Sequence, residues 1–445
     1  MKLEAYASLI VSSYLSLLLP PPALAFAPTP SGRAISLTHQ NEAEKILRRS
    51  ASSLKRYAHQ SSRRRALSNI AIGTSAPFLN VGSAAGLPSP ALAATATPVA
   101  DLPMIRLQLP PQAFGREYVV VELMVNSHGP FEFMVDSGLT TEMITPHLQE
   151  TLGITPKRGG GVVRGLSAGG DSSEALLELD GVSLCCGKFA GGNELKLPPL
   201  HAVVTDFPQE HIDPKHNVEG MLGMELLDLF DADFDFPNNR LRLWSPGTAA
   251  AEASKKGLVK IPDAVLNETG LLGIRVTSTT ATSKQPVVGI LDCGASFSCV
   301  NWAAAKYLGL PPKDDNAYRN SPAIMGIGID GRPLMLPTHE LQFTYVGEAS
   351  KDAKGEIHFE DPSPSFKPWD PVTVGIGDLP VFSQLLGDGI TPYNGPAVLL
   401  GLDVLSQRRV ILETGRGRAR KMYVGPKKLT SVAKGSHIGN RFRCS

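Results

Sequence analysis

The sequence predicts an all-β protein in which one fold unit is used twice. Phe133 to Thr140 and Gly289 to Ser296 each contain an apolar run, one Asp, a small residue, Gly, and a hydroxyl-bearing residue four positions past the Asp. Such self-similarity along a chain indicates a repeated structural unit. Short alternating runs such as Tyr118 to Val125, with 43 Gly and 36 Pro residues in the chain, indicate strands separated by tight turns.

A short helix is expected after the Asp in both copies. Thr145 and Asn301 each stand nine residues past the Asp and are of the type that caps a helix N-terminus. Both segments then end in Leu-Gly, at Gly153 and Gly309, and Gly commonly closes a helix. Each Asp therefore lies where a strand turns toward a helix of the same length.

The copies also share a later Leu-Gly-x-acid element. Leu222 to Leu227 is matched by Leu400 to Leu405, and a strand-like run follows each of them. The second copy is longer by about 22 residues, and a loop from about Glu348 to Asp370, rich in Pro and acidic residues, accounts for the difference. The correspondence thus extends well beyond one short motif.

Asp136 and Asp292 are the candidate catalytic residues. A single Asp at the end of a strand is ordinarily solvated or capping, but a pseudo-twofold arrangement brings matched positions together at its axis. Two carboxylates about 3 Å apart cannot both ionise, so the pair holds one proton. One carboxylate can then act as a base toward water and the other as an acid toward a carbonyl oxygen.

The residues beside each Asp form two matching candidate active-site loops. They are Ser137, Gly138 and Thr140 in the first copy and Cys293, Gly294 and Ser296 in the second. We expect each Gly to let the backbone approach the carboxylates and donate N–H groups, which a side chain would block.

The motif apolar-apolar-Asp-Ser/Thr-Gly, followed later by apolar-Leu-Gly-x-acid, resembles that of aspartic peptidases of the retropepsin type, fused in one chain as in pepsin. The resemblance covers about Val99 to Val424. It implies a bilobal pepsin-like acid protease fold with two pseudo-twofold-related β-barrel-like lobes, residues 94–250 and 251–425, with short helices and a cleft between them. It also implies an aspartic endopeptidase in which Asp136 and Asp292 activate a water without a covalent intermediate.

Two departures from the family pattern leave an alternative open. The residue after the Asp is normally Ser or Thr, which ties the two loops together; Ser137 fits, whereas the thiol of Cys293 is a weaker donor and acceptor. Leu139 is bulkier than the family's small residue and either narrows the site or points into the core. The alternative is a catalytically weak or inactive relative that binds peptides.

A Gly-rich hairpin in each copy is a candidate flap, a cover that keeps water out of a cleft. The first contains Gly165 and Gly169, and the second contains Gly326 and Gly328. Either hairpin alone could be an ordinary flexible turn, and the sequence leaves open whether one flap or two are present.

Residues 1 to 93 are expected to be a targeting presequence. A short apolar region from Leu9 to Leu19 leads to Ala23-Leu24-Ala25, which has the form of a signal-peptidase site. Phe26 and a basic, Ser-rich stretch follow, an order that resembles the presequence of algae with complex plastids. Plain secretion is the alternative.

A third signal follows within the presequence. Twin arginines in Ser62 to Leu67 precede a mildly apolar segment that ends in Ala91-Leu92-Ala93, the pattern of a twin-arginine signal. Inside a plastid this signal would lead to the thylakoid lumen.

The net charge of the chain after residue 93 argues against nucleic acid as a partner. Residues 1 to 93 hold 10 Lys and Arg against 3 Asp and Glu, so the remainder has a net charge of −6 although the whole chain has +1. An acidic protein has no electrostatic reason to bind nucleic acid. The tail at 426–445 is basic and is expected to be disordered.

The expected partner is a polypeptide substrate, and the protein is expected to be a monomer. No run of 18 apolar residues remains after the presequence, so no stable membrane span is expected. The spacing of His201, His211 and His216 matches no metal motif, and no cofactor is assigned.

Overall fold

The computed structural model describes residues 97–109, 115, 117–155, 162–167, 170–206, 213, 215–266, 269–282, 285–319, 321, 323–327, 333–386, 393–413 and 419–427. The expected presequence (1–93) and nearly all of the basic tail lie outside these residues. The described chain is mostly β-strand with short helices, so the predicted all-β class is confirmed. We call the described residues up to 250 the first half and those from 251 the second half.

Strands make up most of both halves. Those of the first half are β1 (Ala100–Pro103), β2 (Ile105–Gln108), β3 (Glu117–Val125), β4 (His128–Val135), β5 (Glu142–Ile144), β6 (Val162–Ser167), β7 (Gly170–Leu179), β8 (Val182–Leu184), β9 (Lys188–Phe189), β10 (Leu195–Lys196), β11 (Leu200–Val204), β12 (Val218–Leu222), β13 (Asp231–Asp235) and β14 (Arg240–Trp244). Those of the second half are β15 (Val259–Val265), β16 (Leu272–Ser278), β17 (Val287–Leu291), β18 (Cys299–Val300), β19 (Ala323–Ile327), β20 (Pro333–Leu341), β21 (Phe343–Tyr345), β22 (Ala349–Lys351), β23 (Ile357–Phe359), β24 (Val372–Ile376), β25 (Ala397–Leu400), β26 (Arg409–Leu412) and β27 (Ala419–Val424).

The helices are short. They are α2 (Pro146–Leu152), α3 (Met224–Leu227), α4 (Ala249–Lys255), α5 (Trp302–Tyr307), α6 (Pro380–Leu385) and α7 (Leu402–Leu405), with 3₁₀ turns η1 (Phe236–Asn238) and η2 (Asn316–Tyr318). Within the described ranges, none of these helices has the length and apolar character needed to cross a membrane.

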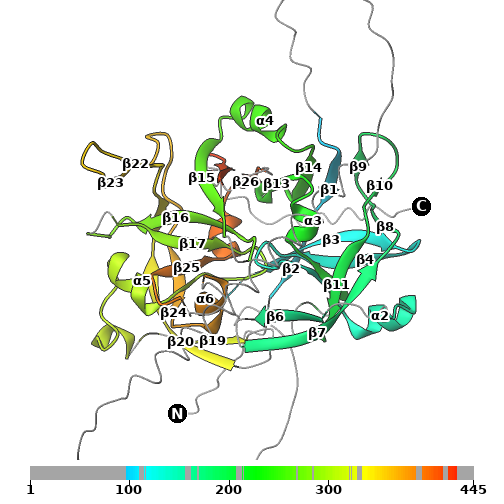
Figure 1. The fold of residues 1–445 in the computed structure, drawn as a ribbon, viewed down its shortest axis with the longest axis horizontal. Coiled ribbons are helices and arrows are strands. Elements are labelled where there is room, and N and C mark those ends of the chain that lie inside the picture. The colour runs from blue at the N-terminus through cyan, green and yellow to red at the C-terminus, as the bar shows by residue number, and fades with distance from the viewer. Residues whose placement is uncertain are drawn as a thin grey trace, which may run out of the picture. The chain divides into compact units, whose positions relative to one another are not determined.

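The two halves have the same strand topology. In the first half β12 pairs parallel with β4 and antiparallel with β5, and in the second half β25 does the same with β17 and β18. The ladder continues through β11 and β7 in the first half and through β24 and β20 in the second, with the same parallel and antiparallel order. The duplication predicted from the motifs therefore extends to a matching run of five strands in each half, β4, β12, β5, β11 and β7 in the first and β17, β25, β18, β24 and β20 in the second (Figure 1).

The last strands of the two copies join the halves. β13 pairs antiparallel with its neighbour β14 and also with β26, so that Asp233 lies opposite Ile411 in the ladder. β26 in turn pairs with β27, and β27 with β15. Backbone hydrogen bonds thus run continuously from one half into the other.

Both predicted helices have the expected caps. The Thr145 side chain accepts the N–H of Leu148 at 3.0 Å at the start of α2, and the Asn301 side chain accepts the N–H of Ala304 at 2.8 Å at the start of α5. Gly153 closes α2 in the left-handed conformation (φ 62°), which a residue with a side chain adopts only with strain. The capping prediction is confirmed in both copies.

Buried central strands position the motif. The last residues of β4, Phe133 to Val135, are buried, as is all of β12 beside them. Gly220 in β12 is required by this packing, because a Cβ there would lie 2.3 Å from the ring of Phe133. The extra loop of the second copy contains a small hairpin, β22 with β23, that forms its own two-stranded sheet.

Candidate active site

Equivalent hydrogen bonds hold the two motif aspartates at the ends of equivalent strands. Asp136 follows β4, and its N–H donates to the carbonyl of Leu222 at 2.9 Å. Asp292 follows β17, and its N–H donates to the carbonyl of Leu400 at 3.0 Å. In both halves the acceptor is the Leu that precedes the Gly of the Leu-Gly-x-acid element, so this element fixes the backbone of the Asp.

The two carboxyl groups meet, and they are hydrogen-bonded to each other. Each motif Gly packs against the Asp of the other half: a Cβ on Gly138 would lie 2.6 Å from Asp292 Cγ, and a Cβ on Gly294 would lie 2.2 Å from Asp136 Cγ. Neither position could hold a side chain without displacing the opposite carboxyl. The structure therefore brings together the four residues that the repeat predicted to be adjacent.

The two aspartates have different surroundings. Asp136 is 8% exposed, and burial followed by the charge of Asp292 raises its pKa well above the ordinary value. Burial also raises the pKa of Asp292, but hydrogen bonds from Asp136 and from the N–H groups of Ala295 and Gly294 oppose the rise. Both N–H groups lie 3.0 Å from Asp292 Oδ1. Asp136 also has backbone donors, the N–H groups of Gly138 at 2.7 Å and of Gly294, so donors alone do not distinguish the two carboxyls. The charge of Asp292 is an additional cause that raises the pKa of Asp136, and Asp136 is therefore the member that favours the shared proton.

Ser137 and Cys293 tie the two loops together by four reciprocal contacts. Ser137 Oγ donates to the carbonyl of Leu291 at 2.9 Å and accepts the N–H of Cys293 at 3.0 Å. Cys293 Sγ donates to the carbonyl of Val135 and accepts the N–H of Ser137, both at 3.2 Å. The thiol thus makes the same two contacts as the hydroxyl, and each is weaker because sulfur is a poorer hydrogen-bonding atom.

Cys293 is not placed to be a nucleophile. It is 3% exposed, and burial, followed by the charge of Asp136, raises the pKa of its thiol to about 12. A protonated, buried thiol is inert.

The remaining loop residues differ between the halves. Thr140 is exposed, whereas its counterpart Ser296 is buried. Leu139 packs against the hydrophobic core, which is the second of the two orientations that its size allowed.

Both candidate flaps are hairpins where they are described. Gly165 lies in β6, opposite Ser172 of β7, and Gly326 lies in β19, opposite Leu334 of β20. Gly169 and Gly328 lie outside the described residues. In addition, α6 of the second half packs against β6 (Figure 1), so the first hairpin touches both halves.

Sequence reasoning missed a second carboxyl pair. Glu225, the acid of the first Leu-Gly-x-acid element, faces the buried Glu142, and burial followed by the charge of Glu225 raises the pKa of Glu142 to about 8. Glu142 Oε1 accepts the N–H of Leu226 at 3.1 Å, while its Oε2 meets no donor among the described residues. Both oxygens of Glu225 accept from His201, one from Nδ1 at 2.8 Å and one from the backbone N–H at 3.1 Å.

The second half has Ser and Asp at the same two positions. Ser298 Oγ donates to Asp403 Oδ1 at 2.6 Å, and the N–H of Ser298 donates to Oδ2 at 3.0 Å. Burial raises the pKa of Asp403 to about 6, and these bonds oppose the rise. Glu142 and Ser298 both stand six residues past the motif Asp, so aligning the two copies one step further would have identified both pairs.

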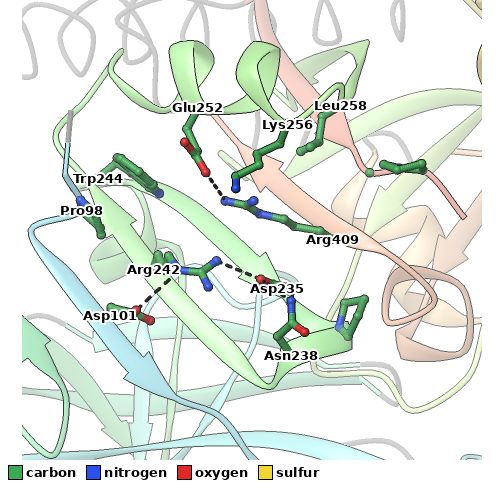
Figure 2. Close-up of a pocket in the computed structure, with 13 residues that line it drawn as sticks. Pro98, Asp101, Asp235, Asn238, Arg242, Trp244, Glu252, Lys256, Leu258 and Arg409 are labelled. Carbon is green, nitrogen blue, oxygen red and sulfur yellow. Dashed lines mark hydrogen bonds and ion pairs between the residues drawn. The ribbon is translucent and has the colours of Figure 1, made fainter. Parts of the chain in front are cut away.

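A polar pocket of about 550 Å³ lies on the sheet that joins the halves, and neither motif Asp lines it (Figure 2). Two of its cations are paired: Arg242 lies 3.0 Å from Asp235, and Arg409 binds the fully buried Asp233 through two nitrogens at 2.8 and 2.5 Å. Removing Arg409 would take two charge-assisted hydrogen bonds from the buried Asp233, which would keep only Trp244 Nε1 at 3.1 Å and Arg242 at 3.7 Å, so the loss should be destabilising. This cluster therefore stabilises the junction between β13 and β26.

Among the described residues, one group of side chains has the spacing to hold a metal ion. Asp352, Glu356 and His358 lie on the β22–β23 hairpin and are all exposed. Asp352 Oδ2 already pairs with His358 Nε2 at 3.2 Å.

Comparison with known proteins supports the aspartyl protease family for the first copy. A family model described as aspartyl protease matches residues 121–226, which include Asp136 and the first Leu-Gly-x-acid element. None of the curated protein sequences matches this chain. Basic 7S globulin from soybean is a structurally similar solved protein, with 11% sequence identity, a TM-score of 0.35, and coverage of 74% of this chain and 96% of that chain. That score is below the range in which two chains are taken to share a fold.

Proposed function

We propose that this protein is an aspartic endopeptidase that hydrolyses peptide bonds with a water held by Asp136 and Asp292. The observation that carries the proposal is the pair of hydrogen-bonded carboxyl groups, each covered by the Gly of the opposite loop. Such a pair shares one proton and thus provides a base and an acid side by side. The aspartyl protease match over the first copy supports the same chemistry.

The environments of the two aspartates assign their roles in the proposed reaction. Asp292, which accepts the N–H groups of Gly294 and Ala295, takes a proton from the water as its oxygen attacks the peptide carbonyl carbon. Asp136, the more buried partner, gives its proton to the carbonyl oxygen. The resulting tetrahedral diol collapses when Asp136 takes a hydroxyl proton back and Asp292 protonates the leaving nitrogen. The C–N bond then breaks, and no covalent enzyme intermediate forms.

The proposed substrate is a polypeptide in extended conformation. Extended peptides bind β-rich proteins by adding hydrogen bonds to a strand, and the β6–β7 and β19–β20 hairpins are the candidate covers. Covering the site would exclude water and strengthen the interactions of the carboxyl pair.

The decisive experiment compares the purified chain with Asp136→Asn and Asp292→Asn on an unfolded protein substrate between pH 4 and 7. Each variant should lose activity by about 10³-fold or more, because removing one member of a catalytic pair removes most of its function. Ser137→Thr, which keeps a hydroxyl, is the matched control and should cleave. A wild-type chain that binds peptides but cleaves none would reject the proposal in favour of a peptide-binding relative.

We also propose a plastid location, in the thylakoid lumen, with residues 1 to 93 removed in stages. The order of the three signals in the sequence supports this route over secretion. Importing the labelled precursor into isolated plastids and sequencing the mature N-terminus tests it. Replacing Arg63 to Arg65 with lysines should stop the last transfer only, and a mature chain recovered from the culture medium would favour secretion.

A further inference from the structure

Two buried hydroxyl groups from opposite halves meet beside the aspartate pair. Tyr118 in β3 and Ser296 in the loop after Asp292 are each 2% exposed. The hydroxyls face each other within interaction range, but neither has a hydrogen bond of normal geometry to any described residue. Leaving a buried polar group unpaired costs about 1–3 kcal/mol, so a feature of this kind calls for an explanation.

The surroundings of this hydroxyl pair favour Tyr118 as a donor. Burial raises the pKa of Tyr118 above its ordinary value, and the charges of Asp292 and Asp136 raise it further, so the phenol stays protonated. A Cβ on Gly115 would lie 2.1 Å from Ser296 Oγ, so the backbone of Gly115 covers the hydroxyl of Ser296. The pair is therefore enclosed by the first half while Ser296 itself belongs to the second.

The opposite side of the site has no such pair. Val120 lies opposite Met134 in the β3–β4 ladder, and Tyr118 stands two residues before Val120 in β3. At the matching place in the second half, Gly273 lies opposite Ile290 in the β16–β17 ladder, and the fully buried Leu271 stands two residues before Gly273.

Thr140, the counterpart of Ser296, is exposed. The positions that match Tyr118 and Ser296 in the opposite half thus hold an apolar side chain, Leu271, and an exposed one, Thr140. Packing of the backbone alone therefore requires no hydroxyl group at either position.

We propose that Tyr118 is a positioning residue that holds the loop carrying Asp292, through a hydrogen bond to Ser296 made directly or through one water. This inference rests on the proposed peptidase function. It adds a link between the halves on the side of the site where Cys293 supplies only a thiol. The Tyr118 hydroxyl thereby restrains the loop from which Asp292 must face the water.

The first test measures kcat, KM and the pH profile of cleavage for Tyr118→Phe, Ser296→Ala and the double variant. Each single variant should lower kcat by about tenfold, the equivalent of one hydrogen bond, with KM nearly unchanged. The double variant should be no worse than either single one. The acid limb of the profile should move to higher pH, because losing a nearby donor disfavours the ionised form of Asp292.

Tyr345→Phe is the matched control. Tyr345 is also buried, and its hydroxyl accepts the N–H of Ser363 at 2.7 Å. This variant should lose stability but keep the wild-type pH profile. An unmoved acid limb in Tyr118→Phe, or multiplicative losses of kcat in the double variant, would overturn the proposal.

Unfolding measurements separate this inference from the proposed function. The same variants are unfolded in urea at pH 5, where activity is irrelevant. Non-additive shifts of the midpoint for Tyr118→Phe and Ser296→Ala support the link, and additive shifts overturn it. If the wild-type chain cleaves nothing, the peptidase proposal fails, and the link is then judged by this unfolding cycle alone.

Discussion

The two halves hold the same backbone frame with different chemistry at one matched pair of positions. Beyond the motif Asp, the first half pairs Glu142 with Glu225, and the second half pairs Ser298 with Asp403. A hydroxyl satisfies the acid in the second half without changing the charge of the site, whereas two carboxyls in the first half must share a proton. The fold therefore requires a hydrogen bond between these two positions, but either a hydroxyl or a protonated carboxyl can donate it. The motif glycines beside the aspartate pair allow no such freedom, because a Cβ at either one would displace the opposite carboxyl.

The largest effect is expected where the halves are most alike, at the motif glycines. Gly294→Ala and Gly138→Ala should each lower the rate of cleavage by about 10²-fold or more, because the new Cβ displaces the opposite carboxyl. Gly294→Ala should be the more severe, since its Cβ would lie 2.2 Å from Asp136 Cγ against 2.6 Å for Gly138 and Asp292. Kinetics on folded variants check both. Equal activity to wild type in either variant would mean that the carboxyls do not meet in solution.

The Glu142–Glu225 pair should give the first half its own dependence on pH. Burial and Glu225 raise the pKa of Glu142 from 4.5 to about 8. At pH values between these two, the unfolded chain has lost this proton while the folded chain keeps it. The unfolded state then binds fewer protons, and the free energy of unfolding falls as pH rises from 4.5 to 8. Glu142→Gln should remove this part of the loss, about 2–4 kcal/mol between pH 5 and 8.

Urea unfolding of wild type and Glu142→Gln at pH 5, 6.5 and 8 measures the difference. The variant should be the more stable protein at pH 8, because Gln keeps the acceptor for Leu226 and adds an N–H donor toward Glu225. Two parallel pH curves would contradict a shared proton.

The Ser298–Asp403 pair should respond less. Ser298→Ala removes the 2.6 Å bond to Asp403 and the acceptor of the Gly401 N–H, at a cost of about 1–3 kcal/mol. Because losing a donor disfavours the carboxylate, the cost should grow as pH rises past the pKa of Asp403, about 6. Thermal unfolding at pH 5 and 7 checks this. Ser298→Thr, which keeps the hydroxyl, is the control, and a cost that shrinks with pH would reject the assignment.

The smallest effect is expected at Cys293. Cys293→Ser should keep or modestly increase cleavage, because Ser supplies stronger bonds to Val135 and Ser137 in the same geometry. The change makes the two loops chemically alike. Steady-state kinetics measure it, with Cys299→Ser, another buried free thiol, as the comparison. Complete loss of activity in folded Cys293→Ser would mean that the thiol takes part in the reaction.

The sequence predicted those features that depend on local rules. Helix caps at Thr145 and Asn301 and the glycines of the motif follow from backbone chemistry within a few residues, and the repeat placed Asp136 and Asp292 at matching strand ends. A longer alignment of the two copies would have marked Glu142 and Glu225 as matched positions. That their carboxyls meet, and that Tyr118 meets Ser296, depends on contacts across the fold between residues far apart in the chain. The orientation of Leu139 likewise required the packing of the core to be known.

The ladder between β13 and β26, with Arg409 bound to Asp233, holds both halves of the site in one chain, so the site should stay assembled when the protein is diluted. Two aspartates brought together by separate chains would part as protein concentration falls, whereas here the encounter is intramolecular, at an effective concentration on the order of mM or more. The initial rate should therefore remain proportional to protein concentration at any dilution, with no lag while halves associate. Assembly of the site therefore depends on the folding of each chain and not on the concentration of the protein.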